Sequence, residues 1–244
     1  MSKISLPSAA ITLHFMNDDT RTPEHNKAHP AFRYAKLAGL FVMILLPLYL
    51  FGHLAKDVID HEGFAFDNPL LLFLHLHATP SWDKAMLFFS RIGSAIIIVP
   101  FNGAVLVLLL CKRLRPQSWF WALTVCGAAL MNVLAKHAFS RARPDLWLSI
   151  SPETTFSFPS GHAMQSMAVA CGVVALVWHT RWRNASIGIA ILFVVAVGIS
   201  RVYLGVHYPS DILAGWCASF AWVTGLRSAF FHRRPTRFCL ERSY

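Results

Sequence analysis

Charged residues are scarce in this chain of 244 residues: only 14% are Asp, Glu, Lys or Arg, whereas 55% are hydrophobic. The mean hydropathy is +0.48. Soluble domains carry about 25% charged residues, so this composition excludes an ordinary soluble protein. Acidic residues are the scarcest, because only 12 Asp and Glu accompany 22 Lys and Arg.

The sequence also lacks a nucleic-acid-binding motif, despite its formal net charge of +10. The excess of basic residues lies in short segments beside hydrophobic runs, without interleaved aromatic residues. Membrane orientation and attraction to anionic headgroups explain such segments more simply. We therefore expect no nucleic-acid partner.

Metal-binding and disulfide patterns are missing as well. The five cysteines form no CxxC pair, and none lies in a segment predicted to face outward, so we expect no structural disulfide. His75 and His77 are two positions apart, which on a helix separates them by about 200° and disfavours a shared metal. We interpret these two residues, with His53 and His61, as residues at the membrane interface. No metal and no cofactor is predicted.

Six hydrophobic runs account for the composition. Each is roughly 17–21 residues long, which a helix needs to cross a hydrocarbon core of about 30 Å. The runs are Tyr34–Leu54, Ser94–Cys111, Trp119–Phe139, His162–Trp178, Ala185–Val202 and Ile212–Phe231. The sequence therefore predicts an all-α, polytopic membrane protein with six transmembrane helices.

The runs define the expected domain organisation. Residues 1–33 are largely polar and are predicted to be a disordered cytoplasmic tail. Residues 34–231 are expected to form one six-span domain, followed by a basic cytoplasmic tail at residues 232–244. Because no small-x-small cleavage site follows the first run, we expect an uncleaved signal anchor.

The positions of Lys and Arg predict the orientation. If the N-terminus is cytoplasmic, most of the basic residues fall in cytoplasmic segments, as the positive-inside rule requires. These are Lys3, Arg21, Lys27, Arg33, Lys36, Lys112, Arg113, Arg115, Arg181, Arg183, Arg227, Arg233, Arg234, Arg237 and Arg242. Both termini are thus predicted to be cytoplasmic.

The segment between the first two runs, residues 55–93, is then on the outer face. Asp67-Asn68-Pro69 before a run of Leu and Phe predicts a short capped helix, and Ser81-Trp82-Asp83 predicts another. Both are too short to cross and are expected to lie in the plane of the interface. They either fill space or form a rim through which a lipid reaches a site.

A first polar cluster ends the third run. Lys136 closes the run, and Arg143 precedes Pro144. Proline disfavours helical geometry in the residue before it, so Arg143 can reach a ligand from a loop. Arg suits bidentate contact with phosphate, and Lys supplies a point charge. Taken alone, the cluster also fits an ordinary basic end of a span.

The second cluster, Pro159-Ser160-Gly161-His162, directly precedes the fourth run. Ser160 is expected to cap this helix, whose N-terminal N–H groups can bind an anion. Gly161 would let the backbone approach a phosphate closely. His162, in the first turn, would donate a proton to a leaving-group oxygen.

The third cluster lies around the end of the fifth run. Ser200-Arg201 closes the run, and His207 and Asp211 follow on either side of Pro209. A carboxylate on one imidazole nitrogen fixes the tautomer and leaves the other nitrogen as a nucleophile. His207 would attack phosphorus to form a phosphohistidine, with Asp211 supporting the imidazolium.

These three clusters, in this order and on one predicted face, resemble the three-part signature of the type 2 phosphatidic acid phosphatase superfamily. This superfamily includes bacterial membrane lipid phosphatases and vanadium haloperoxidases. The resemblance implies that five residues hold the phosphate: Lys136, Arg143, Ser160, Gly161 and Arg201. It implies three catalytic residues: the nucleophile His207, the general acid His162 and the orienting Asp211.

His137, Arg141 and Asp145 occupy no signature position, and we interpret His137 as packing or interfacial. Arg141 is interpreted as a surface residue, with assistance to the substrate charge as the alternative.

The resemblance therefore implies a metal-independent lipid phosphatase in a bacterial inner membrane, and the orientation places its site on the periplasmic face. Undecaprenyl diphosphate and phosphatidylglycerophosphate are the favoured substrates, taken from the outer leaflet, without an obligatory protein partner. A lipid A phosphatase or a lipid-to-lipid phosphotransferase is the main alternative, because both share the phosphohistidine step. A haloperoxidase, a transporter and an inactive homologue fit less well, since the polar residues lie at span ends and both histidines are present.

Overall fold

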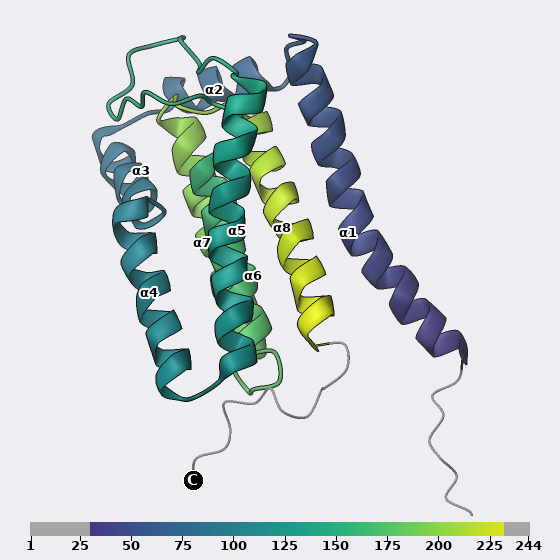
Figure 1. Ribbon diagram of the computed structural model, residues 1–244. Helices are drawn as coiled ribbons and strands as arrows, with labels where there is room; N and C mark the ends of the chain where they lie inside the picture. Colours follow the sequence, from purple (N-terminus) through teal and green to yellow (C-terminus); the bar gives the residue numbers. More distant parts are fainter. Residues whose placement is uncertain (1–29, 232–244) are drawn as a thin grey trace, which may run out of the picture. The chain divides into compact units, whose positions relative to one another are not determined.

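The computed structural model describes residues 30–231, which form helices and their connections and contain no strand. The helices in this range are α1 (Pro30–Ile59), α2 (Asp67–Leu76), α3 (Pro80–Ile92), α4 (Ala95–Cys111), α5 (Arg115–Phe139), α6 (Gly161–Leu176), α7 (Arg183–Tyr203) and α8 (Pro209–Phe231) (Figure 1). The predicted all-α class is confirmed. The predicted tails lie almost entirely outside the described residues.

The chain divides into two units, residues 1–38 and 39–244, and α1 crosses their boundary. The description that follows concerns the second unit. Within it, the later part of α1 packs through Ala55 and Val58 on Phe158 and Ala214. Phe51 stacks on Phe158, with ring centroids 6.0 Å apart.

Helix length and hydropathy mark three membrane spans in the described residues, and a fourth if a bent pair counts as one. The three are in α1 (from Ala38), α5 and α7, and the bent pair is α3 with α4, at 41°. This is a multi-pass membrane protein, while the six-span layout stays a prediction. All six predicted runs are nevertheless helices.

Two predicted spans, α6 and α8, do not meet the criterion of length and hydropathy for a membrane span. Both are enclosed by other helices. Helix α6 packs against α5, α7 and α8. It has 16 residues and is apolar, so its length and not its hydropathy keeps it from the criterion of a span. Helices that face other helices in a membrane use small residues for close approach. Helix α6 accordingly has Ala163, Ala168, Ala170, Gly172 and Ala175 buried along its length.

Helices α2 and α3 occupy the two positions predicted for short helices, but the expected cap of α2 is wrong. Asp67 is the first residue of α2, and the residue at the cap position is the apolar Phe66. The Asp67 carboxylate instead binds Ser210, at the start of α8. Helix α3 is capped conventionally, because the Thr79 hydroxyl accepts from the N–H of Trp82 at 3.3 Å.

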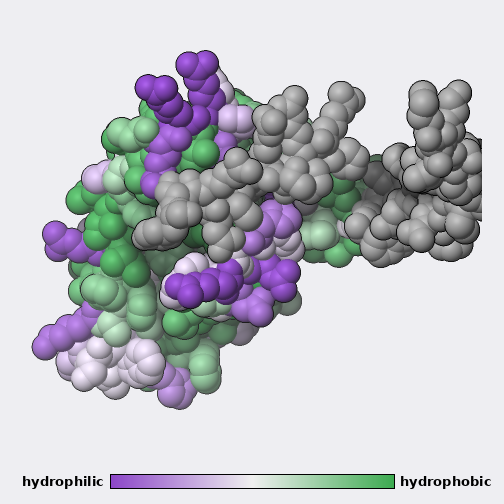
Figure 2. Space-filling model, turned by 90° about the horizontal axis from the view of Figure 1, so that it is seen from below, coloured by the Kyte–Doolittle hydropathy of each residue, from purple (hydrophilic) through white to green (hydrophobic). Residues whose placement is uncertain are grey.

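The three polar clusters lie at one end of the helices, where α5 and α7 finish and α6 and α8 begin (Figure 1). Lys112, Arg113 and Arg181 are in the connections at the opposite end, where Arg183 begins α7. Figure 2 views the molecule from that side and shows hydrophilic groups among hydrophobic ones. Charged residues thus lie at both ends of the helices, and the orientation in the membrane stays a prediction.

Gly215 sets the distance between α8 and the start of α6. A Cβ atom at this position would lie 3.0 Å from the carbonyl oxygen of Ser160 and 3.1 Å from the Cβ of Ala163. Backbone atoms cannot move aside as the end of a flexible side chain can. The absence of a side chain therefore lets α8 bring His207 and Asp211 close to His162.

We expect Gly215→Val to destabilise the protein by about 1–3 kcal/mol, the usual cost of overpacking. Thermal unfolding in detergent would show this as a lower melting temperature. Gly225→Val is the matched control on the same helix, because among the described residues no atom beyond the helix's own nearby backbone lies within 4 Å of a Cβ placed at that position. Equal melting temperatures for the two variants would contradict this account of the packing.

Candidate active site

Residues from all three predicted clusters meet at this end of the helices. Arg143 Nη1 lies 3.3 Å from His207 Nε2, which joins the first cluster to the third. The backbone N–H of Ser160 donates to the carbonyl oxygen of Asp211 at 3.1 Å, which joins the second to the third. The sequence spacing therefore identified residues that the fold brings together.

His207 and Asp211 form the expected pair. Nδ1 of His207 lies 3.3 Å from Oδ2 of Asp211, and both side chains are buried. Arg143 can only donate, so Nε2 of His207 is the acceptor and Nδ1 carries the proton in the neutral ring. This tautomer leaves the Nε2 lone pair available for attack. Burial lowers the pKa of His207 to about 4, although the hydrogen bond to Asp211 raises it.

The turn that carries His207 depends on Gly205. Its φ is +68°, in the left-handed region that favours glycine. A Cβ there would also lie 2.6 Å from the Trp147 ring. The next carbonyl, of Val206, accepts from Arg143 Nη1 at 2.6 Å. This turn thus places His207 beside a guanidinium.

Two guanidinium groups converge on Glu153, a residue that no sequence pattern singles out. Arg143 Nη2 lies 3.2 Å from Oε2 of Glu153, and Arg201 Nη2 donates to Oε1. The two Arg side chains are 12% and 1% exposed, and that of Glu153 is 29% exposed. Arg201 is also held by the hydroxyl of Ser90, from α3. Its buried Nε has no hydrogen-bond partner within residues 30–231.

Glu153 is ionised in this position. Burial raises its pKa, but the charges of Arg201, His162 and Arg143 outweigh that effect and hold the pKa below its usual value. The carboxylate also interacts electrostatically with His207. An anion of the protein itself therefore occupies the space among the predicted catalytic and phosphate-binding residues.

Lys136 faces the same segment from the end of α5. Its Nζ donates to the hydroxyl of Thr155 at 2.9 Å and to the carbonyl oxygen of Phe156 at 2.6 Å. Arg143 donates to the same two residues, at 3.0 Å and 3.4 Å. The two cations are thus bound to one stretch of chain, residues 153–156, next to the histidines.

Ser160 is the N-cap of α6, as predicted. Its hydroxyl accepts from the N–H of Ala163 at 3.5 Å. Gly161 has a packing role that the sequence did not reveal, because a Cβ would lie 3.0 Å from the amide oxygen of Asn132. Asn132 in turn donates to the carbonyl oxygen of Pro159 at 3.0 Å. The start of α6 is therefore fixed against α5, with His162 in its first turn.

The surface interpretation of Arg141 is wrong. Its side chain is only 14% exposed and lies 2.6 Å from Asp211 and 3.0 Å from Asp67. The error arose because the signature assigns no role to this position and its partners are 70 and 74 residues away. His137, by contrast, is exposed and packs edge-on against Phe156, as expected for a packing residue. His75 stacks on Trp147, with centroids 4.1 Å apart.

The sequence also missed Ser157, which lies under the His–Asp pair. Its hydroxyl donates to Oδ2 of Asp211 and lies 3.5 Å from Nδ1 of His207. Nothing in the local pattern around Ser157 distinguishes it from other loop serines. The same holds for Glu153, whose role depends on two arginines from separate clusters.

The geometry provides a histidine with a lone pair on Nε2, a second histidine, and fixed cations that hold an anion. Such a site can stabilise the charge that spreads over three phosphoryl oxygens during transfer. It can also form a covalent intermediate on the imidazole.

Several known phosphatases are similar to this chain in sequence. The family model described as PAP2 superfamily matches residues 116–235. An undecaprenyl-diphosphatase from Sulfolobus acidocaldarius is 26% identical over 193 residues, covering 77% of this chain and 86% of that protein. Phosphatidylglycerophosphatase B from Bacillus subtilis is 42% identical over 93 residues, which are 36% of this chain and 45% of that protein.

The fold has a solved counterpart as well. The crystal structure of a transmembrane PAP2-type phosphatidylglycerolphosphate phosphatase from Bacillus subtilis superposes with a TM-score of 0.67. It shares 24% identity and covers 82% of this chain and 98% of that one. Residues 116–235 therefore carry a PAP2 superfamily domain, and the chain is an enzyme similar to the phosphatases that these relatives represent.

Proposed function

We propose that this protein is a metal-independent lipid phosphatase that removes a terminal phosphate from a lipid phosphate or diphosphate. The observation that carries the proposal is the position of Glu153. Its carboxylate lies between Arg143 and Arg201 and beside both histidines, where an incoming phosphoryl group would find the same contacts. The fixed cations supply the charge neutralisation that a metal provides in other phosphatases.

The proposed reaction has two steps. Nε2 of His207 attacks phosphorus, the bond from phosphorus to the leaving oxygen breaks, and His162 gives that oxygen a proton. Water then attacks the phosphohistidine, losing a proton to His162, and inorganic phosphate leaves. Asp211 stabilises the imidazolium that forms on His207. Lys136, Arg143 and Arg201 hold the phosphoryl oxygens, with N–H groups at the start of α6, next to Ser160 and Gly161.

The location belongs to the same proposal. We place the protein in a bacterial inner membrane, with six spans, both termini in the cytoplasm and the site facing the periplasm. The alternation of the polar clusters and the basic connections between opposite helix ends supports this orientation. Undecaprenyl diphosphate and phosphatidylglycerophosphate are the substrates we favour, because relatives named for these activities are similar to this chain.

A groove that reaches His162 supports a lipid substrate. It lies between α4, α5 and α6, has a volume of about 550 Å³, and its lining is mostly apolar. Its lining runs along α5 from Trp121 to Val133, about 18 Å at 1.5 Å per residue. This is close to one leaflet of a hydrocarbon core of about 30 Å. An apolar chain in the groove would therefore leave its phosphate at the histidine.

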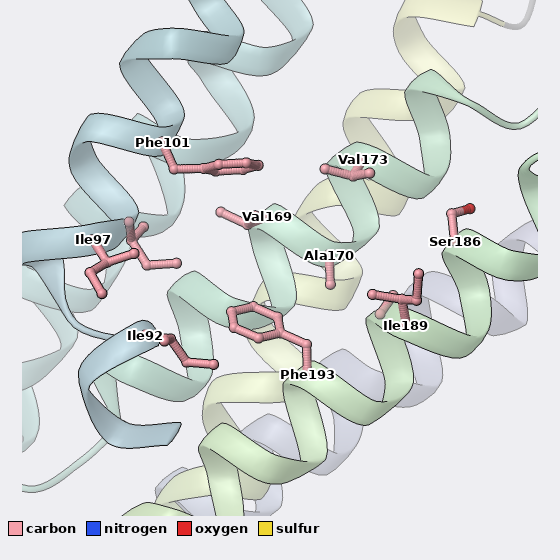
Figure 3. Close-up of a pocket in the computed structure, with 11 residues that line it drawn as sticks. Ile92, Ile97, Phe101, Val169, Ala170, Val173, Ser186, Ile189 and Phe193 are labelled. Atoms are coloured by element: carbon pink, nitrogen blue, oxygen red, sulfur yellow. The ribbon is translucent and has the colours of Figure 1, made fainter. Parts of the chain in front are cut away.

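A second apolar cavity, of about 360 Å³, lies on the other side of α4 (Figure 3). Phe101 from α4 and Phe193 from α7 point into it. Its lining contains none of the proposed catalytic or phosphate-binding residues. The continuity with His162 is what distinguishes the first groove as the place of a substrate chain.

The first test is phosphate release by the detergent-purified protein with and without EDTA. The substrates are undecaprenyl diphosphate, phosphatidylglycerophosphate, phosphatidic acid and lipid A. We expect EDTA-resistant release that His207→Ala abolishes, because the attacking atom is lost. Activity that EDTA removes, or that His207→Ala retains, would refute the mechanism. Transfer to an added lipid acceptor without release would instead identify a phosphotransferase.

The groove generates a second prediction. No atom of the described residues lies within 4 Å of a Cβ placed on Gly103, which lines the groove, so Gly103→Leu fills it without a backbone clash. Displacing two or three buried methylenes, at about 0.8 kcal/mol each, would raise KM for a long-chain lipid about tenfold or more. Hydrolysis of p-nitrophenyl phosphate should not change. Gly188→Leu, at an equally open position on α7, is the control; equal effects of both variants would exclude this groove.

The position of Glu153 leads to a third prediction. If its carboxylate competes with phosphate, Glu153→Gln should lower the inhibition constant of orthovanadate about tenfold, or about 1.4 kcal/mol in binding free energy. Asp145→Asn removes an exposed carboxylate from the same connecting segment and should have no such effect. Weaker vanadate binding by Glu153→Gln would mean that Glu153 orders the guanidinium groups instead.

A further inference from the structure

Arg141 lies on the side of Asp211 that faces away from the nucleophile. Oδ2 of Asp211 is close to His207 Nδ1, to the Ser157 hydroxyl and to the N–H of Tyr208, at 2.9 Å. Oδ1 accepts from Arg141 Nη1 at 2.6 Å. The two oxygens of one carboxylate therefore contact two different groups of the protein.

Arg141 is itself held on several sides. Its Nη2 lies 3.0 Å from Oδ2 of Asp67, and its Nη1 donates to the Ser210 hydroxyl at 2.8 Å. The guanidinium lies over the Tyr208 ring, 4.1 Å from the centroid. Such a planar cation stacked on an aromatic ring and bound to two carboxylates has little freedom to turn.

Asp67 completes the arrangement from α2. Oδ1 accepts from the backbone N–H of Ser210 at 2.9 Å, and the Ser210 hydroxyl donates to Oδ2 at 2.6 Å. The first residue of α2 thus binds an N–H in the first turn of α8, the helix that carries Asp211. Asp67 is 4% exposed and Asp211 is fully buried.

We propose that Arg141 and Asp67 are positioning residues of the phosphatase reaction, which act through Asp211 on the nucleophile His207. Arg141 fixes the orientation of the Asp211 carboxylate, and Asp67 fixes Arg141. The two also set the charge around the nucleophile, because one cation lies between two buried carboxylates. This inference rests on the proposed function.

The charge balance makes opposite predictions for the two residues. Without Arg141, Asp67 and Asp211 remain as two uncompensated anions, and a more negative surrounding favours the protonated form of His207. Without the Asp67 carboxylate, Arg141 is less neutralised, and the neutral imidazole is favoured. Attack requires the neutral ring, so the acidic limb of the pH profile reports this balance.

Other charged and titratable groups face the His207–Asp211 pair and stay the same in the variants compared. They are Lys136 from α5, Arg143 and Glu153 from the connection between α5 and α6, His162 from α6, Arg201 from α7 and Tyr208 beside α8. A difference in the acidic limb between variants is therefore caused by the substituted residue.

The experiment measures kcat/KM for p-nitrophenyl phosphate against pH, for the wild-type protein and its variants. We expect Arg141→Gln to move the acidic limb up by about one pH unit, the usual effect of losing a nearby opposite charge. Asp67→Asn should move it down, and the double variant should lie close to wild type. Arg141→Lys should keep the limb in place, because it keeps the charge.

A role confined to stability predicts a different result. Removing a cation from a buried ion pair destabilises proteins strongly, so Arg141→Gln alone is the variant most at risk of failing to fold. The double variant keeps the test valid, because it removes both charges together, and melting temperatures identify folded preparations. Acidic limbs at the same pH in Asp67→Asn, the double variant and wild type would overturn the inference. Absence of activity in the wild-type protein would overturn the proposed function instead.

Discussion

Ion pairs between buried arginines and carboxylates organise the polar end of this protein. Arg201 is 1% exposed and Arg141 is 14% exposed, and a buried cation is costly unless an anion lies beside it. Each therefore requires a carboxylate from elsewhere in the chain, Glu153 for Arg201 and Asp67 with Asp211 for Arg141. These requirements determine where the connecting segments run and where α2 and α3 sit.

The short helices outside the predicted spans are parts of this arrangement. Helix α2 supplies Asp67, and helix α3 supplies the Ser90 hydroxyl that holds Arg201. Tyr203, near the end of α7, donates to Asp83 of α3 at 2.6 Å. The alternatives considered from sequence, filler or a rim for lipid entry, did not include a role in holding the charged residues of the site.

Residues that belong to a recurrent pattern could be predicted from the sequence, and their partners could not. Ser160 was predicted as a cap because the cap bonds to its own helix three residues later. Asp67 looks like a cap by the same local rule, yet its carboxylate binds Ser210, 143 residues away. Hydrophobic runs located six helices, but hydropathy does not separate a helix that faces lipid from one enclosed by protein, as α6 shows. Arg141, Ser157 and Glu153 carry no local signal, since each gains its role only when distant segments meet.

Arg141 and Arg201 bind residues that lie outside the region matched by the family model. The family model begins at residue 116, whereas Asp67 and Ser90 lie before it. A protein cut to the matched region would keep every signature residue. It would also leave Arg201 without the Ser90 hydroxyl and Arg141 without one of its two carboxylates. The signature therefore describes the groups proposed to meet the phosphate, while the segments that hold these groups in place extend further toward the N-terminus.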